Sequence, residues 1–216
     1  MSLLGLIKFL ELITAILGSV FYKKYSHSFL RYFLFLLWFV VGVEFTMWAL
    51  KHYNDIRFQN NFIYNVLTSI LYIYFFLLYY KIINTARYKR LVFFFLIAFI
   101  LSVTVNFLWI QGLMLTTPFH SYPFTIGAIL LILTIGLFFV EILNTEKVLY
   151  FKRYLMFWIS VGLFLYYTAI IPYIISLNFL PAFRSSSIWS FIIFTLNLMM
   201  YGCFSIGFIV SKKLSD

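Results

Sequence analysis

The chain has 216 residues, of which 64% are hydrophobic and 10% are charged. An average soluble domain is about 45–50% apolar and about 25% charged. A globule of this length exposes much of its surface to water, so it cannot bury that many apolar side chains. The composition therefore excludes an ordinary soluble domain and indicates a protein that lies in a lipid bilayer.

Seven apolar runs are each long enough to cross about 30 Å of hydrocarbon as a helix that rises about 1.5 Å per residue. In chain order they are Leu3–Phe21, Tyr32–Leu50, Phe62–Tyr80, Leu91–Ile110, Phe124–Leu143, Leu155–Ile175 and Ile188–Val210. The sequence thus predicts an all-α membrane protein, with one seven-helix transmembrane domain over residues 1–216. The connectors are short, so we expect no appended kinase, nucleotide-binding or DNA-binding domain.

The first run has the length of a retained helix but could also be read as a cleaved signal peptide. No basic residue precedes its apolar stretch, whereas Lys23 and Lys24 follow it, and no small-residue cleavage site is present. A signal peptide has the opposite charge order and ends in such a site. We therefore expect the first run to remain as a membrane-spanning helix.

The basic residues alternate from one connector to the next and so predict an orientation. Most of the 16 lysines and arginines lie in the first, third and fifth connectors and in the C-terminal tail, whereas the even-numbered connectors hold Lys51, Arg57 and Arg184. Basic connectors face the cytoplasm. The N-terminus is then outside and the C-terminus cytoplasmic. The net charge of +10 reads as this topology signal, and its short clusters do not form the continuous basic face of a nucleic-acid-binding protein.

Polar side chains inside the apolar runs are costly in lipid, so each one requires a partner or a role. In the predicted orientation most of them lie in the outer half of the membrane. Asn65, Thr68, Ser69 and Tyr72 share one helical face by their spacing, and Ser102, Asn106 and Trp109 are spaced to share another. We expect an outward-facing pocket for a small ligand or lipid, lined by Glu44, Asn65, Asn106, Trp109, Tyr167 and Asn197.

The alternative is that such side chains only join helices to one another, as Ser, Thr and Asn commonly do in membranes. Glu11 has Lys8 one turn before it and is interpreted as structural. Pro172 lies well inside the sixth predicted span, where a proline removes a backbone hydrogen-bond donor from the helix. We interpret Pro172 as a hinge beside Tyr167, through which a bound ligand could move the inner face.

The residue types needed for several seven-helix chemistries are missing from the apolar runs. The last run has no lysine to form a retinal Schiff base, and His27, His52 and His120 all lie in connectors, without metalloprotease spacing. His52, Asp55 and His120 lie on the same outer side, but their spacing is not specific for a metal. We expect no enzyme activity, no metal and no cofactor.

Several stretches resemble bacterial seven-helix membrane proteins of the sensor type, found alone or preceding histidine kinases. The resemblance rests on Gly18–Tyr25, the late Glu44, Phe157–Tyr167, and the spacing of Asn197, Tyr201, Gly207 and Phe208. It implies a signalling module in the bacterial inner membrane. Because this chain lacks a kinase region, such a module would signal through a separate cytoplasmic or membrane protein.

Three functions fit these observations. The first is a receptor-like or accessory signalling module that binds a small ligand or lipid and reports to a partner through its basic inner loops. The second is a carrier of a small solute or of protons that uses Glu44 as its titrating group. The third is a structural subunit that packs against another membrane protein. In each case the lipid bilayer is the surrounding partner.

Overall fold

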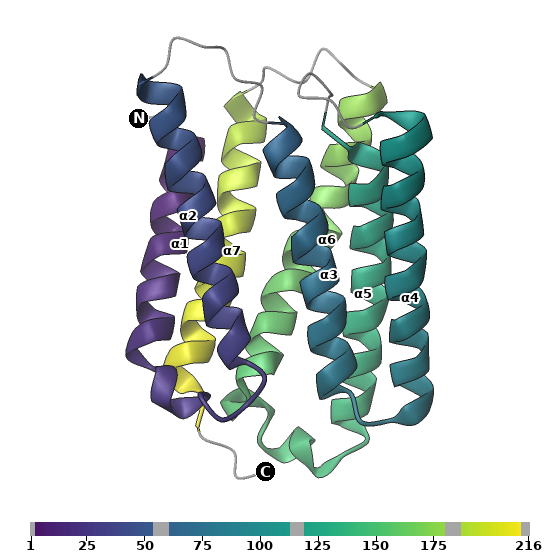
Figure 1. Ribbon diagram of the computed structural model, residues 1–216. Helices are drawn as coiled ribbons and strands as arrows, with labels where there is room; N and C mark the ends of the chain where they lie inside the picture. The colour runs from purple at the N-terminus through teal and green to yellow at the C-terminus, as the bar shows by residue number, and fades with distance from the viewer. Residues whose placement is uncertain (1–2, 54–60, 113–118, 180–186, 213–216) are drawn as a thin grey trace. The chain divides into compact units, whose positions relative to one another are not determined.

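The computed structural model describes residues 3–53, 61–112, 119–179 and 187–212 (Figure 1). Apart from short connectors it is helical in these ranges, and its seven long helices are all apolar enough to cross a membrane. They are α1 (Leu3–Val20), α2 (Arg31–Tyr53), α3 (Asn61–Ile82), α4 (Ala86–Val105), α5 (Ser121–Leu143), α6 (Leu155–Phe179) and α7 (Ser187–Val210). The prediction of seven helices that are long and apolar enough to cross a membrane is confirmed, and it suggests a multi-pass membrane protein. Arg57, Asp55 and Arg184 lie outside the described residues.

The bounds of α4 differ from the predicted run at both ends. The helix begins at Ala86 and holds Arg87, Lys89 and Arg90 in its first turns, because long basic side chains can extend from a helix end toward water. At its other end, α4 passes directly into a π-helical turn, η2 (Asn106–Ile110). Three short 3₁₀ turns complete the described secondary structure: η1 (Tyr22–Lys24), η3 (Glu146–Leu149) and η4 (Phe151–Arg153).

The chain divides into two compact units, and both α2 and α5 belong partly to each. Unit 1 comprises Met1–Gly42 and Phe139–Asp216, and unit 2 comprises Val43–Phe138. Unit 1 therefore contains α1, α6, α7, the first part of α2 and the end of α5, whereas unit 2 contains the rest of α2 and of α5 with α3 and α4.

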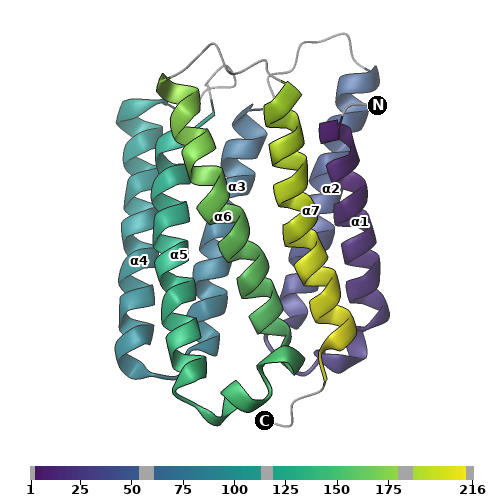
Figure 2. The ribbon, with the colours of Figure 1, turned by 180° about the vertical axis from the view of Figure 1, so that it is seen from behind.

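In unit 1, α7 packs against both α1 and α6 (Figure 2). A side chain at Gly207 would bring its Cβ within 2.8 Å of the Trp158 Cβ, so α6 and α7 approach closely there. The Thr14 hydroxyl of α1 lies 3.2 Å from the Ser205 hydroxyl of α7. Because α1 runs parallel to α7, the described N-terminal and C-terminal ends lie at opposite ends of this unit, as an odd number of spans requires.

The first helix buries its polar residues and turns its apolar residues outward, the reverse of a soluble helix. Its buried positions are Lys8, Glu11, Thr14, Ala15 and Gly18. Glu11 is 5% exposed, and its Oε1 accepts a hydrogen bond of 3.0 Å from the Tyr201 hydroxyl of α7. The structural role predicted for Glu11 therefore includes a partner on another helix.

The connector after α1 is held against the end of α7. The Lys24 ammonium donates to the carbonyl oxygens of Phe208 at 3.2 Å and Ile209 at 2.7 Å. The last carbonyl groups of a helix have no partners within the helix, so a lysine there satisfies them and complements the helix dipole. One of the basic residues used to assign orientation thus also has a structural role.

Candidate functional site

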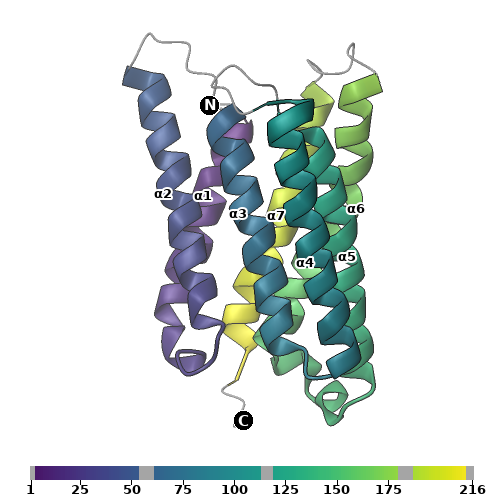
Figure 3. The same cartoon turned by 45° about the vertical axis from the view of Figure 1, so that its right-hand side comes forward.

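In unit 2, α3 and α5 run parallel and α4 runs antiparallel to both (Figure 3). Aromatic pairs join them along their length. The Tyr72 ring of α3 lies 5.0 Å from that of Phe99 on α4 and 5.9 Å from that of Phe124 on α5. Further along α3, the ring of Tyr79 lies 5.6 Å from that of Phe138 on α5. These contacts fix the register of the three helices.

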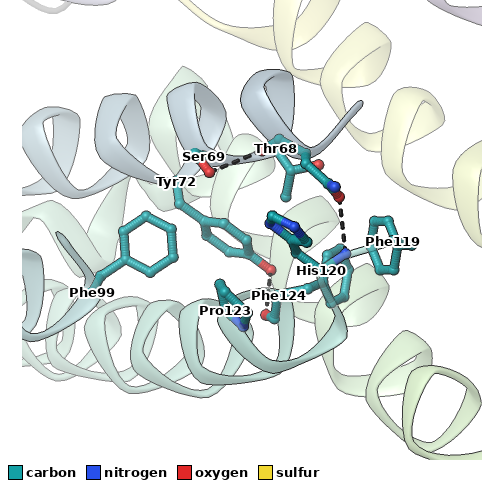
Figure 4. A pocket seen from close by; sticks show the side chains of 9 residues that line it. Thr68, Ser69, Tyr72, Phe99, Phe119, His120, Pro123 and Phe124 are labelled. Carbon is teal, nitrogen blue, oxygen red and sulfur yellow. Dashed lines mark hydrogen bonds between the residues drawn. The ribbon is translucent and has the colours of Figure 1, made fainter. Parts of the chain in front are cut away.

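A small cavity lies between these helices, near the start of α3 and α5 (Figure 4). It is lined by Asn65, Thr68, Ser69, Tyr72, Phe99, Phe119, His120, Pro123 and Phe124. About 10 Å³ is open to the centre of a water molecule, which is roughly the space that one water requires. We call it the His120 cavity. The predicted face of Asn65, Thr68, Ser69 and Tyr72 lines it, so that prediction is confirmed.

Most polar groups of the cavity are fixed by hydrogen bonds to the backbone. The Oδ1 atom of Asn65, which is 3% exposed, accepts from the backbone N–H of His120 at 2.9 Å. The hydroxyl of Ser69 donates to the Asn65 carbonyl at 2.9 Å, and that of Tyr72 donates to the Phe124 carbonyl at 3.0 Å. Asn65 therefore connects α3 to the chain entering α5.

His120 has a free nitrogen in this cavity. Its ring lies 4.9 Å from the ring of Phe107, its side chain is 5% exposed, and its Nε2 has no hydrogen-bond partner. Burial lowers the pKa of His120, and a hydrogen bond to the Gly112 backbone offsets this only in part. The imidazole is therefore neutral at physiological pH, and Nε2 offers a lone pair to an occupant.

The π-helical turn places a second set of buried polar atoms at this end of unit 2. The carbonyl of Asn106 accepts from the backbone N–H of Gln111 at 3.0 Å and of Gly112 at 3.2 Å. Gly112 has a φ of 74°, a conformation that glycine adopts without strain. The Asn106 side chain is 1% exposed, and neither its Nδ2 nor its Oδ1 has a partner, nor has the Gln111 Oε1.

Trp109 lies away from this cluster. It is 74% exposed, although the spacing predicts that it shares a face with Asn106. A π-helix has more residues per turn than an α-helix, so positions three apart across η2 no longer lie one above the other. The π turn therefore turns Asn106 inward and Trp109 outward.

Glu44 lies on the part of α2 that belongs to unit 2. It is half-buried, and its Oε2 accepts a hydrogen bond of 3.1 Å from the Tyr64 hydroxyl of α3. Tyr64 directly precedes Asn65 in the sequence, so this carboxylate is held at the end of α3 that carries the cavity. In the described part of unit 2, Glu44 is the one acidic residue.

The remaining predicted residues belong to unit 1. Tyr167 is 6% exposed and its ring meets that of Tyr166 edge to face. Asn197 is 8% exposed and donates from Nδ2 to the Ile193 carbonyl of its own helix at 2.8 Å. Pro172 lies inside α6 and is exposed. Of the six predicted ligand-binding residues, Glu44, Asn65, Asn106 and Trp109 belong to unit 2, and Tyr167 and Asn197 belong to unit 1.

Sequence reasoning did not single out His120 as a ligand-binding residue. It lies just before Pro123 in a connector, where polar residues are ordinary, and its sequence context suggests at most a metal ligand. The signal that could have found it is its position beside the first turn of α5, level with Asn65 at the start of α3. Comparison with protein-family models, with curated proteins and with solved structures finds no match for the chain.

We expect Asn65→Leu to destabilise the protein by about 1–3 kcal/mol, because it leaves the buried N–H of His120 without an acceptor. Thermal unfolding of the purified protein in nanodiscs measures this. Thr104→Val is the control, since Thr104 is exposed and donates only to a carbonyl of its own helix. Equal unfolding midpoints for Asn65→Leu and the control would contradict the role assigned to Asn65.

Proposed function

We propose that the chain is a receptor-like module of the bacterial inner membrane that holds a small polar ligand in unit 2 and signals to a separate partner protein. In this proposal the N-terminus and the His120 cavity face outward and the C-terminus is cytoplasmic. The resemblance to bacterial seven-helix sensors fits this role. Ligand binding shifts the population of two helix arrangements, which the basic inner loops report.

The observation that supports this proposal best is the set of buried polar atoms without partners at one end of unit 2. They are His120 Nε2, Asn106 Nδ2 and Oδ1, and Gln111 Oε1. Buried polar atoms in native proteins nearly always have a partner, and leaving one unsatisfied costs about 1–3 kcal/mol. A bound polar ligand would give these atoms hydrogen-bond partners.

The second candidate function, a carrier, is favoured by one observation. Glu44 is an ionisable group within a span and is held by Tyr64, and such groups commonly mark ion or proton pathways. Flux of a solute into proteoliposomes, lost in Glu44→Gln, supports the carrier. Ligand binding without flux supports the receptor.

Thermal unfolding in nanodiscs, screened against small alcohols, amides, amino acids, amines and anions, tests the proposed function. A ligand raises the unfolding midpoint because it binds only the folded protein. The shift should be lost in His120→Phe, which keeps an aromatic ring against Phe107 but removes Nε2. If no compound shifts the midpoint, or if His120→Phe responds as the parent does, the receptor proposal is wrong.

A further inference from the structure

We propose that the His120 cavity binds an ammonium group, either as the free ion or as the head of a small primary amine. This inference rests on the proposed function and names the chemical class of its ligand. It is carried by the size of the cavity, by the hydrogen-bonding capacity left in its wall, by its aromatic lining and by the charge around it.

The hydroxyl hydrogens of the cavity wall are largely committed to the protein. Ser69 donates its hydrogen to the Asn65 carbonyl, and Tyr72 donates its hydrogen to the Phe124 carbonyl. A hydroxyl has a single hydrogen, so neither residue can donate a hydrogen bond to an occupant, and of the three hydroxyl groups in the wall that of Thr68 alone could. The buried Nε2 of His120, in contrast, is an acceptor without a partner. The wall therefore favours an occupant that donates hydrogen bonds.

The size of the cavity and its apolar lining narrow the chemical class of the ligand further. Its open volume of about 10 Å³ accepts a group with one heavy atom, so a carboxylate, a phosphate or a sugar ring does not fit. Phe99, Phe119 and Phe124 supply three of its walls. Aromatic faces attract cations through the ring quadrupole, most strongly where water is excluded. An ammonium group has one heavy atom and a positive charge, so it fits both the volume and the aromatic lining.

The charges of unit 2 favour a cation at the end of the unit that holds the His120 cavity. Glu44 is held there by Tyr64. The described basic side chains of the unit, Lys81, Arg87, Lys89 and Arg90, lie where α3 ends and α4 begins. Lys81 is about 24 Å from Asn65 along α3, at about 1.5 Å per residue. Among the side chains of unit 2 that the structure describes, the acidic one therefore lies toward the cavity end and the basic ones lie at the opposite end.

Thermal unfolding of the full-length protein in nanodiscs of neutral lipid tests this inference. The probes are ammonium, methylammonium, tetramethylammonium and sodium chlorides at matched ionic strength. We expect a saturable rise of the midpoint with ammonium, a smaller or equal rise with methylammonium, and none with tetramethylammonium or sodium. Tetramethylammonium carries the charge without an N–H group, so it separates hydrogen bonding from attraction to the aromatic rings.

Two variants locate the effect. His120→Phe should weaken ammonium binding about 10- to 100-fold, the cost of a hydrogen bond to a charged group, while its midpoint in sodium chloride reports whether it folds. Glu44→Gln should weaken binding of the charged probe. Glu146→Gln is the matched control, because Glu146 is exposed in η3 of unit 1.

Equal midpoints in ammonium and sodium chlorides would overturn the amine inference and leave water as the occupant of the cavity. An equal response of His120→Phe and the parent would overturn it as well. If the wider screen finds another compound that depends on His120, the proposed function stands and only the amine is wrong. If nothing in either experiment binds, both proposals are wrong.

Discussion

Glu11→Leu should destabilise the protein by about 3–5 kcal/mol, the largest effect that we expect of a single substitution. Removing one of two opposite charges that are buried close together leaves the other uncompensated, at about that cost. Lys8 is 6% exposed and lies one turn before Glu11 on the buried face of α1. The substitution also removes the acceptor of the Tyr201 hydroxyl. Unfolding by heat or by denaturing detergent measures the loss.

The double variant Lys8→Met with Glu11→Leu is the decisive comparison. Replacing both members of a buried pair by apolar residues is often close to neutral, so we expect the double variant to regain most of the stability lost in Glu11→Leu. Tyr201→Phe measures separately the part that belongs to the hydrogen bond. If the double variant is no more stable than Glu11→Leu, the buried lysine does not depend on this carboxylate.

Gly127→Ala should affect both the stability of the protein and the His120 cavity. A Cβ at Gly127 would lie 2.8 Å from the Phe99 ring and 2.9 Å from the Tyr72 ring, which is closer than carbon atoms pack. Both rings line the cavity. Overpacking of this kind costs about 1–3 kcal/mol. We expect a lower unfolding midpoint and loss of ligand-dependent stabilisation.

Gly136→Ala is the matched control for this prediction. It makes the same change on the same helix, but a Cβ at Gly136 meets nothing within 4 Å. Alanine is favoured over glycine in a helix by about 1 kcal/mol, so the control should be as stable as the parent or more so. If Gly127→Ala and Gly136→Ala behave alike, the close approach of Phe99 and Tyr72 to α5 is not the constraint described above.

The helices could be predicted from the sequence because apolar length alone decides them. A run such as Phe124–Leu143 has to cross the bilayer as a helix, since lipid offers no partner to an open backbone. The ends of the helices are less predictable. The helix α4 begins at Ala86, before the predicted start at Leu91, because basic residues extend to the interface without ending the helix. The face of Asn65 and Tyr72 was predictable for a similar reason, since regular α-helical spacing holds throughout α3.

The candidate site was only partly predictable because two of its features depend on irregular backbone. The spacing of Asn106 and Trp109 assumes an α-helix, and the π turn at Asn106–Ile110 turns them to different sides. His120 lies in a connector, and its approach to Asn65 depends on how α5 packs beside α3. The hydrogen bond between Tyr201 and Glu11 joins residues on the first and last helices, which no local pattern connects.

Cysteine labelling with a membrane-impermeant thiol reagent tests most directly the claim that the His120 cavity faces outward. The background is Cys203→Ser, since Cys203 is the one native cysteine. Tyr122 is 55% exposed at the start of α5, beside the cavity, and Arg87 is exposed at the start of α4, at the opposite end of unit 2. We expect Tyr122→Cys to react in intact cells and Arg87→Cys to react only after permeabilisation. The reverse pattern would place the cavity on the cytoplasmic side and contradict the account.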